Sequence, residues 1–228
     1  MEDTKKQQVK RIFDSISHRY DFLNHFLSLG IDVYWRNKAI KFSGMNSQSK
    51  LLDIACGTGD FAITAKKLGV INIFGADLSL NMLKLFNKKT DWINGRLVES
   101  DAEFLPFKEN TFTNITVAFG VRNFYNIAQA FNSFNKILSA KGKVTVLEFR
   151  IPSNNLIRKF YLFYFNRILP LIGKLISKDK EAYTYLPESV NEFNKKVDLV
   201  KLFNESSFKK VEKYSLTFGL VQVVIAEK

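Results

Sequence analysis

The chain lacks several features by which whole classes of protein are recognised. It has one cysteine, Cys56, which excludes a disulfide framework and fits a reducing compartment such as the cytoplasm. No run of about 18 apolar residues is present, so no membrane-spanning helix is expected. The segment 1–11 is charged and has no apolar core, which argues against a secretory signal. Repeats and low-complexity segments are absent too. We therefore expect a cytoplasmic globular protein.

Residues that bind metals are also scarce. The two histidines, His18 and His25, are seven positions apart and would share one face of a helix. No cysteine or cluster of carboxylates accompanies them along the sequence, as a metal site would require. We therefore expect no metal cofactor.

Positive charge is abundant, with a formal net charge of +12 over 228 residues. Such a charge suits nucleic acid, an anionic membrane surface or acidic substrates. A coding bias toward Lys, Asn, Ile and Phe would produce the same excess. The charge alone therefore does not select a partner. The length and the 46% hydrophobic content fit one α/β domain of good size.

Apolar runs and helical patterns alternate along most of the chain. Strands are expected at 51–55, 70–76, 96–100, 112–119, 143–149, 210–216 and 220–226. This alternation predicts a parallel sheet with helices on both faces. The turn Phe218-Gly219 joins the last two strands into an antiparallel hairpin. We interpret 1–228 as a single domain, with 1–45 as an N-terminal helical cover and 150–195 as a helical insertion.

The stretch 51–60, LLDIACGTGD, predicts a buried strand, a loop with Gly57 and Gly59, and a helix from Asp60. A strand, a glycine turn and a helix open a nucleotide-binding unit. The third glycine of the dinucleotide pattern is missing, and the Asp60 carboxylate would repel a phosphate at the helix N-terminus. A cationic adenosine ligand without phosphates fits better. S-adenosylmethionine has this charge pattern.

Candidate cofactor contacts follow the expected strands at the carboxyl edge of the sheet. Asp77, 18 residues past Gly59, would accept hydrogen bonds from the ribose hydroxyls. The pair Asp101-Ala102 would meet the adenine edge, and Gly57 and Thr58 would lie beside the methionine part. Each has a plainer alternative: Asp77 as a helix cap, Asp101 as a loop acid and Thr58 as a turn residue.

Seven segments of the chain together match one known family in its own order. They are RYDFLNHFLSLGIDVYWR at 19–36, LLDIACGTGD at 51–60, ADLSLNML at 76–83, DAEFLPFKENTF at 101–112, ITVAFGVRNF at 115–124, VLEFRIP at 146–152 and AYTYLPES at 182–189. The chain thereby resembles the ubiquinone/menaquinone biosynthesis C-methyltransferases of the UbiE/MenG type. The glycine loop is shared by many methyltransferases, whereas the N-terminal segment, FGVRN and YTYLPES are much narrower.

The resemblance implies a seven-stranded Rossmann-like fold that uses S-adenosylmethionine. It also implies methyl transfer to a ring carbon of a prenylated quinol, with demethylmenaquinol the expected acceptor. The benzoquinol of ubiquinone biosynthesis stays open as an alternative. Two positions depart from the family pattern. Ala118 stands where serine is frequent, and Val224-Ile225-Ala226 replaces a His-Arg-Gly.

Catalysis is expected to depend on Arg122, Asn123 and Tyr20. Carbon methylation needs a phenolate, and guanidinium is a poor general base because it stays protonated. We expect Arg122 to stabilise the phenolate, with a water it holds taking the proton. Asn123 would orient the ring oxygen, and Tyr20 would bind the substrate or relay the proton. A structural ion pair for Arg122 and a packing role for Tyr20 remain alternatives.

The segment 151–180 carries a net charge of +5 and five aromatic residues within the six positions 160–165. Aromatic and basic residues on one helix suit a helix that lies on anionic lipid, where a prenylated quinol resides. An ordinary helix pair packed on the sheet is the alternative. We expect peripheral membrane contact.

We expect no nucleic-acid partner. FGVRN stands where enzymes that methylate base amino groups carry an Asn/Asp-Pro-Pro-aromatic motif. A silent cofactor-binding module and a homodimer stay open.

Overall fold

The computed structural model describes residues 2–21, 25, 28–168 and 180–228. Its strands are β1 (Lys50–Ile54), β2 (Asn72–Asp77), β3 (Leu97–Glu99), β4 (Phe112–Ala118), β5 (Leu138–Phe149), β6 (Lys209–Leu216) and β7 (Val221–Glu227). Its α-helices are α1 (Glu2–Ile16), α3 (Ile31–Ser43), α4 (Asp60–Lys67), α5 (Leu80–Lys89), α6 (Ile127–Ile137), α7 (Asn155–Phe163), α9 (Lys180–Lys196) and α10 (Leu199–Glu205). Short turns of other helix types are η1 (Ser17–Arg19), η2 (Asp91–Ile93), η3 (Val121–Asn123), η4 (Tyr164–Ile168) and η5 (Thr217–Gly219).

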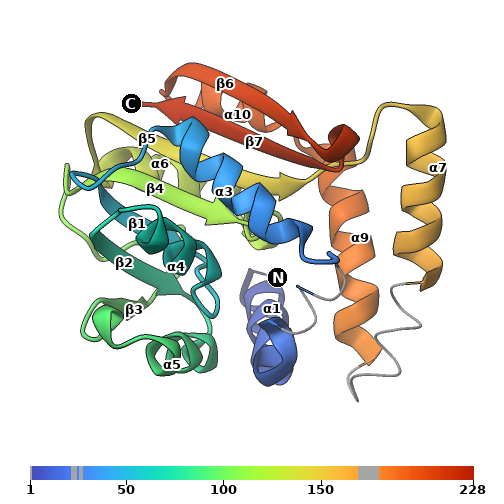
Figure 1. Cartoon of the computed structure of the whole chain (residues 1–228), viewed down its shortest axis with the longest axis horizontal. Coiled ribbons are helices and arrows are strands. Elements are labelled where there is room, and N and C mark those ends of the chain that lie inside the picture. Colours follow the sequence, from blue (N-terminus) through green and yellow to red (C-terminus); the bar gives the residue numbers. More distant parts are fainter. Residues whose placement is uncertain (1, 22–24, 26–27, 169–179) are drawn as a thin grey trace.

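The strands form one seven-stranded sheet in the order β3-β2-β1-β4-β5-β7-β6 (Figure 1). All neighbouring pairs from β3 to β5 are parallel, whereas β7 runs antiparallel to both β5 and β6. The predicted mostly parallel sheet with an antiparallel C-terminal hairpin is therefore confirmed. Strand order reverses beside β1, which places the β1 and β4 loops at the usual ligand-binding point of such sheets.

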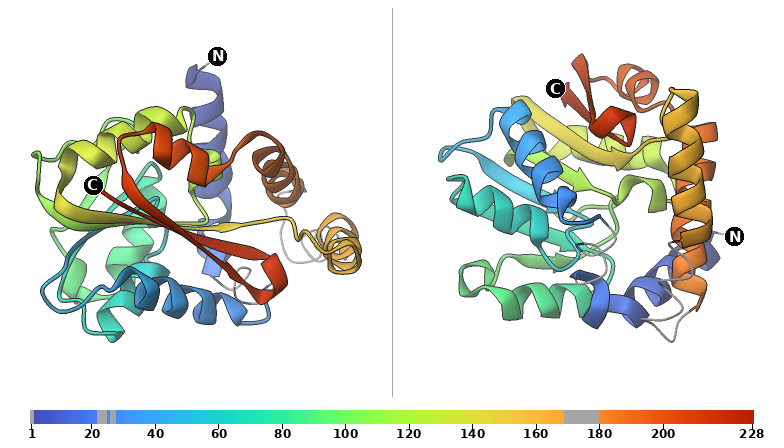
Figure 2. Two further views of the ribbon diagram at one scale, coloured as in Figure 1. Left: turned by 90° about the horizontal axis from the view of Figure 1, so that it is seen from above. Right: turned by 45° about the vertical axis from the view of Figure 1, so that its right-hand side comes forward.

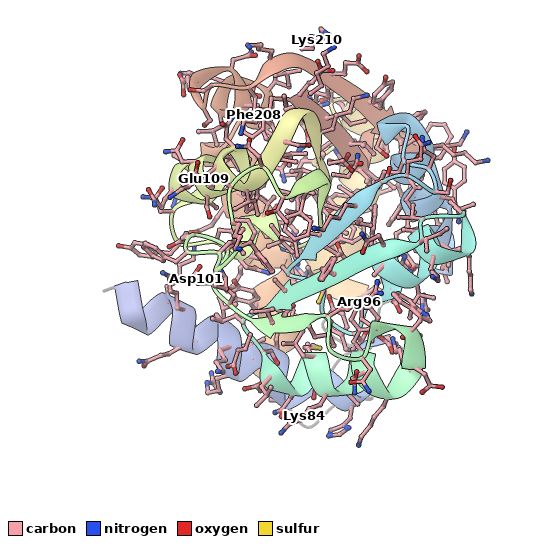
Figure 3. The ribbon with its side chains drawn as sticks, turned by 90° about the vertical axis from the view of Figure 1, so that its left-hand side faces the viewer. Lys84, Arg96, Asp101, Glu109, Phe208 and Lys210 are labelled. Atoms are coloured by element: carbon pink, nitrogen blue, oxygen red, sulfur yellow. The ribbon has the colours of Figure 1, made fainter. Side chains whose placement is uncertain are left out.

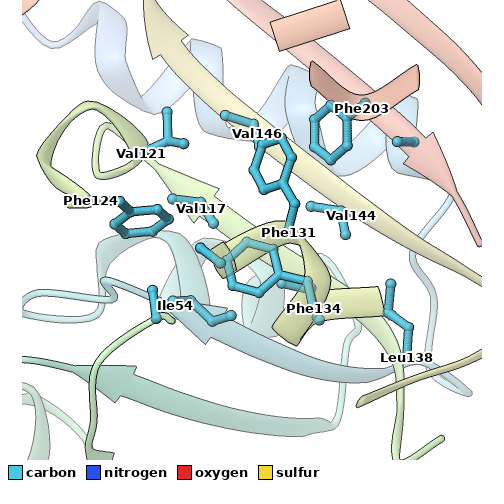
Figure 4. Close-up of a cluster of buried hydrophobic side chains, with 14 of the residues drawn as sticks. Ile54, Val117, Val121, Phe124, Phe131, Phe134, Leu138, Val144, Val146 and Phe203 are labelled. Carbon is cyan, nitrogen blue, oxygen red and sulfur yellow. The ribbon is translucent and has the colours of Figure 1, made fainter. Parts of the chain in front are cut away.

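The two faces of the sheet are covered by different helices because the side chains of each strand alternate between them. On β1, Leu51 packs in a cluster with α3, α4 and α5. Leu52 packs in the other cluster, with Phe131 and Phe134 of α6 and Phe203 of α10. Figure 4 shows this second cluster, in which the aromatic rings of α6 fill the space above β4 and β5.

Local capping residues explain several helix boundaries. Ser79 is the N-terminal cap of α5, and its side chain accepts a hydrogen bond from the backbone N–H of Met82. Asn126 caps α6 in the same way. Gly44 ends α3 in the left-handed conformation, with φ of 71°. Gly30 is also left-handed, with φ of 74°, and directly precedes the first residue of α3.

Two local expectations differ from the structure. β5 begins at Leu138 rather than at Lys143, because Leu138 still pairs with Phe112 across an irregularity in the ladder. The face of one helix that we expected His18 and His25 to share does not form as a continuous α-helix from α1, since α1 ends at Ile16 and His18 lies in η1. Positions 22–24, between the two histidines, lie outside the described residues.

The predicted insertion contributes α7, the π-helical turn η4 and α9; positions 169–179 lie outside the described residues. Figures 1 and 2 show α7 and α9 side by side, on the side of the sheet to which the parallel strands point. Tyr161 of α7 and Phe165 of η4 pack on Val190 of α9. No helix in the described ranges has both the length and the apolar character needed to cross a bilayer.

Candidate active site

The loops at the carboxyl ends of β1 and β4 have a backbone that few residues adopt readily. Ala55 and Phe119 have φ of 50° and 57°, and Gly57 and Gly59 have 54° and 88°. Left-handed backbone at non-glycine residues is uncommon and is concentrated at functional sites. Gly59 is also required by packing, because a Cβ there would lie 2.2 Å from the ring of Phe86.

Two cavities adjoin these loops and share part of their walls. The smaller cavity, of about 80 Å³, is lined by six of the predicted site residues: Tyr20, Gly57, Asp77, Asp101, Ala102 and Asn123. The larger, of about 300 Å³, is lined by Arg122 and by many aromatic side chains. Both are lined by Phe13, Tyr20 and Phe119. The structure therefore brings seven of the eight predicted site residues into the linings of two cavities that share a wall.

Asp77 is held rigidly at the end of β2. Its Oδ2 accepts a hydrogen bond of 2.7 Å from the N–H of Gly57, and its Oδ1 accepts one of 2.8 Å from the N–H of Ser79. Burial raises the pKa of the Asp77 carboxyl, and these two backbone donors oppose that rise. Each carboxylate oxygen keeps a further lone pair, so Asp77 can accept hydrogen bonds from a ligand while it fixes the glycine loop.

Asp101 lines the smaller cavity. Figure 3 shows Asp101 beside α1. Its carboxylate is 2.6 Å from the ammonium of Lys6, which is also 2.8 Å from the carboxylate of Glu103. Ala102 is buried between these two acids. Helix α1 therefore covers the smaller cavity and is attached to it by charge pairs.

Thr58 is the predicted site residue that lines neither cavity. It is buried, and its hydroxyl donates to Asp21. Asp21 is in turn 2.5 Å from the ammonium of Lys89, which is 3.0 Å from Asp60. Thr58 thus links the glycine loop to a group of charges at the start of α4. The charge of Asp60, which we expected to repel phosphate, is shared with cations in the folded chain.

Arg122 makes an ion pair that the sequence did not reveal. Its Nη1 donates to Glu148 Oε1 at 2.9 Å and to the carbonyl of Phe119, and its Nε donates to Ser189 Oγ at 3.3 Å. Burial raises the pKa of the Glu148 carboxyl, and the Arg122 charge opposes that rise. Among the described residues nothing accepts from Nη2. Arg122 is therefore both half of a structural ion pair and a lining residue of the larger cavity.

Tyrosines line the larger cavity together with Arg122, and three of them are Tyr20, Tyr161 and Tyr185. Tyr185 donates a hydrogen bond of 2.9 Å to Asn123 Oδ1, so Asn123 is fixed from α9. The hydroxyl of Tyr161 is buried and has no partner within the described part of the chain. Burial also raises the pKa of Tyr161 far above its ordinary value. Tyr20 lies at the boundary of both cavities, with its ring 5.9 Å from that of Phe13.

Sequence reasoning missed several of these residues. Glu148 and Tyr185 lie in the quoted segments VLEFRIP and AYTYLPES, and a buried acid opposite Arg122 could have been anticipated from an arginine beside an apolar strand. It also missed that carboxylates do lie near His25. His25 Nδ1 is 2.7 Å from Asp32 and Nε2 is 3.5 Å from Asp60. These three residues have the ligand types of a metal site, but both carboxylates are also paired with Arg36.

Several solved structures with this arrangement are described as methyltransferases that use S-adenosylmethionine. One from Thermotoga maritima, described as a possible histamine N-methyltransferase, has a TM-score of 0.65 at 16% identity and covers 96% of this chain and 99% of its own. Another from Methanococcus maripaludis has a TM-score of 0.64 at 19% identity, with 94% and 93% covered. The fold is thus that of S-adenosylmethionine-dependent methyltransferases.

Sequence comparison gives a narrower assignment. The model of the ubiE/COQ5 methyltransferase family matches residues 1–228. A demethylmenaquinone methyltransferase of Chlorobaculum tepidum is 38% identical over 98% of this chain and 93% of its own length. A ubiquinone/menaquinone biosynthesis C-methyltransferase UbiE of Geotalea uraniireducens is 37% identical over 98% and 97%. The chain belongs to the ubiE/COQ5 methyltransferase family, as its sequence motifs predicted.

Proposed function

We propose that the chain transfers a methyl group from S-adenosylmethionine to a ring carbon of a prenylated quinol, with demethylmenaquinol as the acceptor. The observation that carries the proposal is the shared wall of the two cavities. A donor held by Asp77 and a ring held beside Arg122 would meet at Tyr20 and Phe119, which line both. Relatives from Chlorobaculum tepidum and Staphylococcus aureus bear the name demethylmenaquinone methyltransferase.

The residues of the smaller cavity fit this cofactor. Asp77 and Asp101 offer acceptors for hydroxyl and amino groups, and neither suits a phosphate. The backbone N–H of Ala102 is the expected donor to the adenine edge. The cofactor supplies an electrophilic methyl group when bound. The chain itself has to hold that group in line with the ring carbon and keep water away, which accounts for much of the acceleration in such reactions.

The residues of the larger cavity fit a phenolate with an apolar ring. Aromatic walls from Trp35, Phe119, Phe149 and Phe165 would enclose the ring and exclude water. Arg122 Nη2 is the donor for the developing phenolate oxygen, because its other nitrogens are already occupied. Since Glu148 balances the charge of Arg122, the site gains one negative charge only when the phenolate forms. Asn123, fixed by Tyr185, would orient the ring oxygen, and a water held by Arg122 would take the proton.

We also propose that 150–195 serves as a substrate- and membrane-facing insertion on a single domain, with 1–45 as its cover. On α7, Leu156, Phe160 and Phe163 follow one another at spacings of four and three and are 65%, 68% and 60% exposed. Residues 155–168 also contain three cations and no acid. An exposed apolar helix face beside cations fits an anionic lipid surface, where a prenylated substrate would be collected.

The test is mass spectrometry of quinones from a bacterial host whose own demethylmenaquinone methyltransferase has been deleted. Expression of this chain should convert the accumulated demethylmenaquinone to menaquinone. A parallel host blocked at the benzoquinol step tests the alternative acceptor. If the protein is expressed and folded but neither quinone pool changes, the proposed function is wrong.

A further inference from the structure

The charge group at the start of α4 is not explained by the reaction proposed above. It contains the carboxylates of Asp21, Asp32 and Asp60, together with Arg36, Lys89 and His25. It continues from Thr58, which follows the glycine loop and donates to Asp21. The group therefore lies next to the glycine loop, and its members Asp32 and Arg36 line the larger cavity beside that loop. The amino-acid part of an adenosyl ligand held at the loop would reach this point.

Arg36 is the buried cation of this group. Its side chain is 6% exposed, and it projects from α3. Nη2 donates to Asp32 and lies 3.6 Å from Asp60 Oδ2. Nε is buried and finds no acceptor among the described residues. Its charge also lowers the pKa of Asp53, a buried residue of β1, although burial dominates that pKa and raises it. Arg36 therefore lies above the carboxyl end of β1 with donor capacity left unused.

Three cations line the two cavities in the described part of the chain: Lys6 lines the smaller cavity, and Arg36 and Arg122 line the larger one. Lys6 is held between Asp101 and Glu103 at the adenine end. Arg122 is balanced by Glu148 at the quinol end. Lys89 is more exposed, at 28%, and lines neither cavity. Arg36 alone among them combines burial, a cavity-lining position and proximity to the glycine loop.

We propose that Arg36 binds the carboxylate of the methionine part of the cofactor, and that the surrounding acids receive its ammonium. A free α-amino acid end presents one anionic acceptor and one cationic donor. The group at α4 presents the opposite set: a guanidinium with unused N–H donors, and carboxylates in excess over the permanent cations. This inference rests on the proposed function for its cofactor, and it adds a residue that decides which adenosyl compounds are bound.

The test compares two probes that share the adenosine part. S-adenosylhomocysteine has the amino-acid end, and methylthioadenosine lacks it. Calorimetric titration of the full chain should give much tighter binding of the first. Arg36→Gln should weaken S-adenosylhomocysteine by at least about tenfold, because a charge-assisted hydrogen bond is lost, and should leave methylthioadenosine unchanged. Arg36→Lys should recover part of the difference. Lys41→Gln, at an exposed position of the same helix, is the matched control and should change neither affinity.

Other outcomes overturn the inference. Equal weakening of both probes by Arg36→Gln would show that Arg36 only supports the fold. A selective loss in Lys89→Gln, with Arg36→Gln unchanged, would assign the carboxylate to Lys89 instead. If the unmodified chain bound neither probe, the cofactor site itself, and with it the proposed function, would be wrong. The failure of this inference is therefore distinguishable from the failure of the function.

Discussion

At the scale of single residues, the pair Arg122–Glu148 combines a structural ion pair with the role in catalysis that we propose for Arg122. The two side chains are 5% and 0% exposed, and their closest atoms are 2.9 Å apart. Removal of one partner from a buried pair leaves an uncompensated charge, which costs on the order of 3–5 kcal/mol. Stability and turnover therefore have to be measured separately for any substitution of Arg122.

Arg122→Lys keeps the positive charge and loses the planar set of donors. We expect turnover to fall by about a hundredfold, because one preorganised donor to the phenolate is lost. Binding of S-adenosylhomocysteine should stay within a few-fold of the unmodified chain. Arg158→Lys on the exposed side of α7 serves as the control. The catalytic assignment is wrong if both turnover and cofactor affinity survive in Arg122→Lys and Arg122→Ala.

Asp53 gives a prediction about pH, because burial raises the pKa of its carboxyl to about 7 while the Thr116 hydroxyl opposes the rise. An unfolded Asp titrates near 3.9. The folded chain therefore binds this proton more tightly, and the stability it contributes is lost as the pH rises from the unfolded value through about 7. Asp53→Asn has no such loss. Its melting temperature relative to the unmodified chain should increase between about pH 5 and pH 8.5, and a constant difference would contradict the raised pKa.

At the scale of elements, α1 acts as a cover on the cofactor edge. Lys6 pairs with Asp101 and Glu103, and Lys10 lies 2.5 Å from Glu99. The cavity beneath, of about 80 Å³, is small compared with the roughly 300–1,000 Å³ of typical ligand sites. We therefore expect α1 to move when an adenosyl ligand enters.

Lys6→Gln together with Lys10→Gln should raise the association rate of S-adenosylhomocysteine by a few-fold. Each partly exposed pair contributes only about 0.2–1 kcal/mol, so the helix should remain in place. Stopped-flow fluorescence measures the rate. Lys84→Gln, on the exposed face of α5 in Figure 3, is the control. An unchanged rate in the double variant would show that α1 does not limit entry.

Helix α7 gives the second prediction at this scale. Leu156→Ser, Phe160→Ser and Phe163→Ser together remove the exposed apolar face while Tyr161 and Phe165 keep the helix packed on α9. Flotation with vesicles that contain phosphatidylglycerol should fall strongly. Ile71→Ser, an equally exposed apolar residue just before β2, should have no effect. Equal flotation by both variants would refute the membrane-facing role.

At the scale of the whole molecule, cofactor binding should stabilise the fold through the loops that it joins. S-adenosylhomocysteine at a hundred times its Kd should add about 2.7 kcal/mol to the free energy of unfolding. In Asp77→Ala the affinity should fall at least tenfold, so about 1.4 kcal/mol of that gain disappears at the same concentration. Thermal unfolding with and without ligand measures both. An equal gain in the variant would remove Asp77 from the site.

Much of this molecule follows from short stretches of its sequence. Some features depend only on residues that are near neighbours along the chain. They include the alternation of apolar residues, the cap at Ser79 and the glycines of 51–60. From such features the succession of strands and helices and the class of cofactor could be inferred. The start of β5 at Leu138 and the end of α1 at Ile16 could not be inferred in this way. The first depends on pairing with another strand, and the second on where the following segment packs.

The sequence by itself determined the fold class and the family, and it indicated candidate site residues of which all but Thr58 line the two cavities. Only the tertiary structure decided which side chains meet. Arg122 finds Glu148 across 26 positions, and Asn123 finds Tyr185 across 62. It also decided that α1 covers Asp101 and that Arg36 reaches the start of α4. Spacing along a chain fixes local conformation, whereas contacts between distant elements, with the burial and pKa shifts that they cause, exist only once the layers have packed.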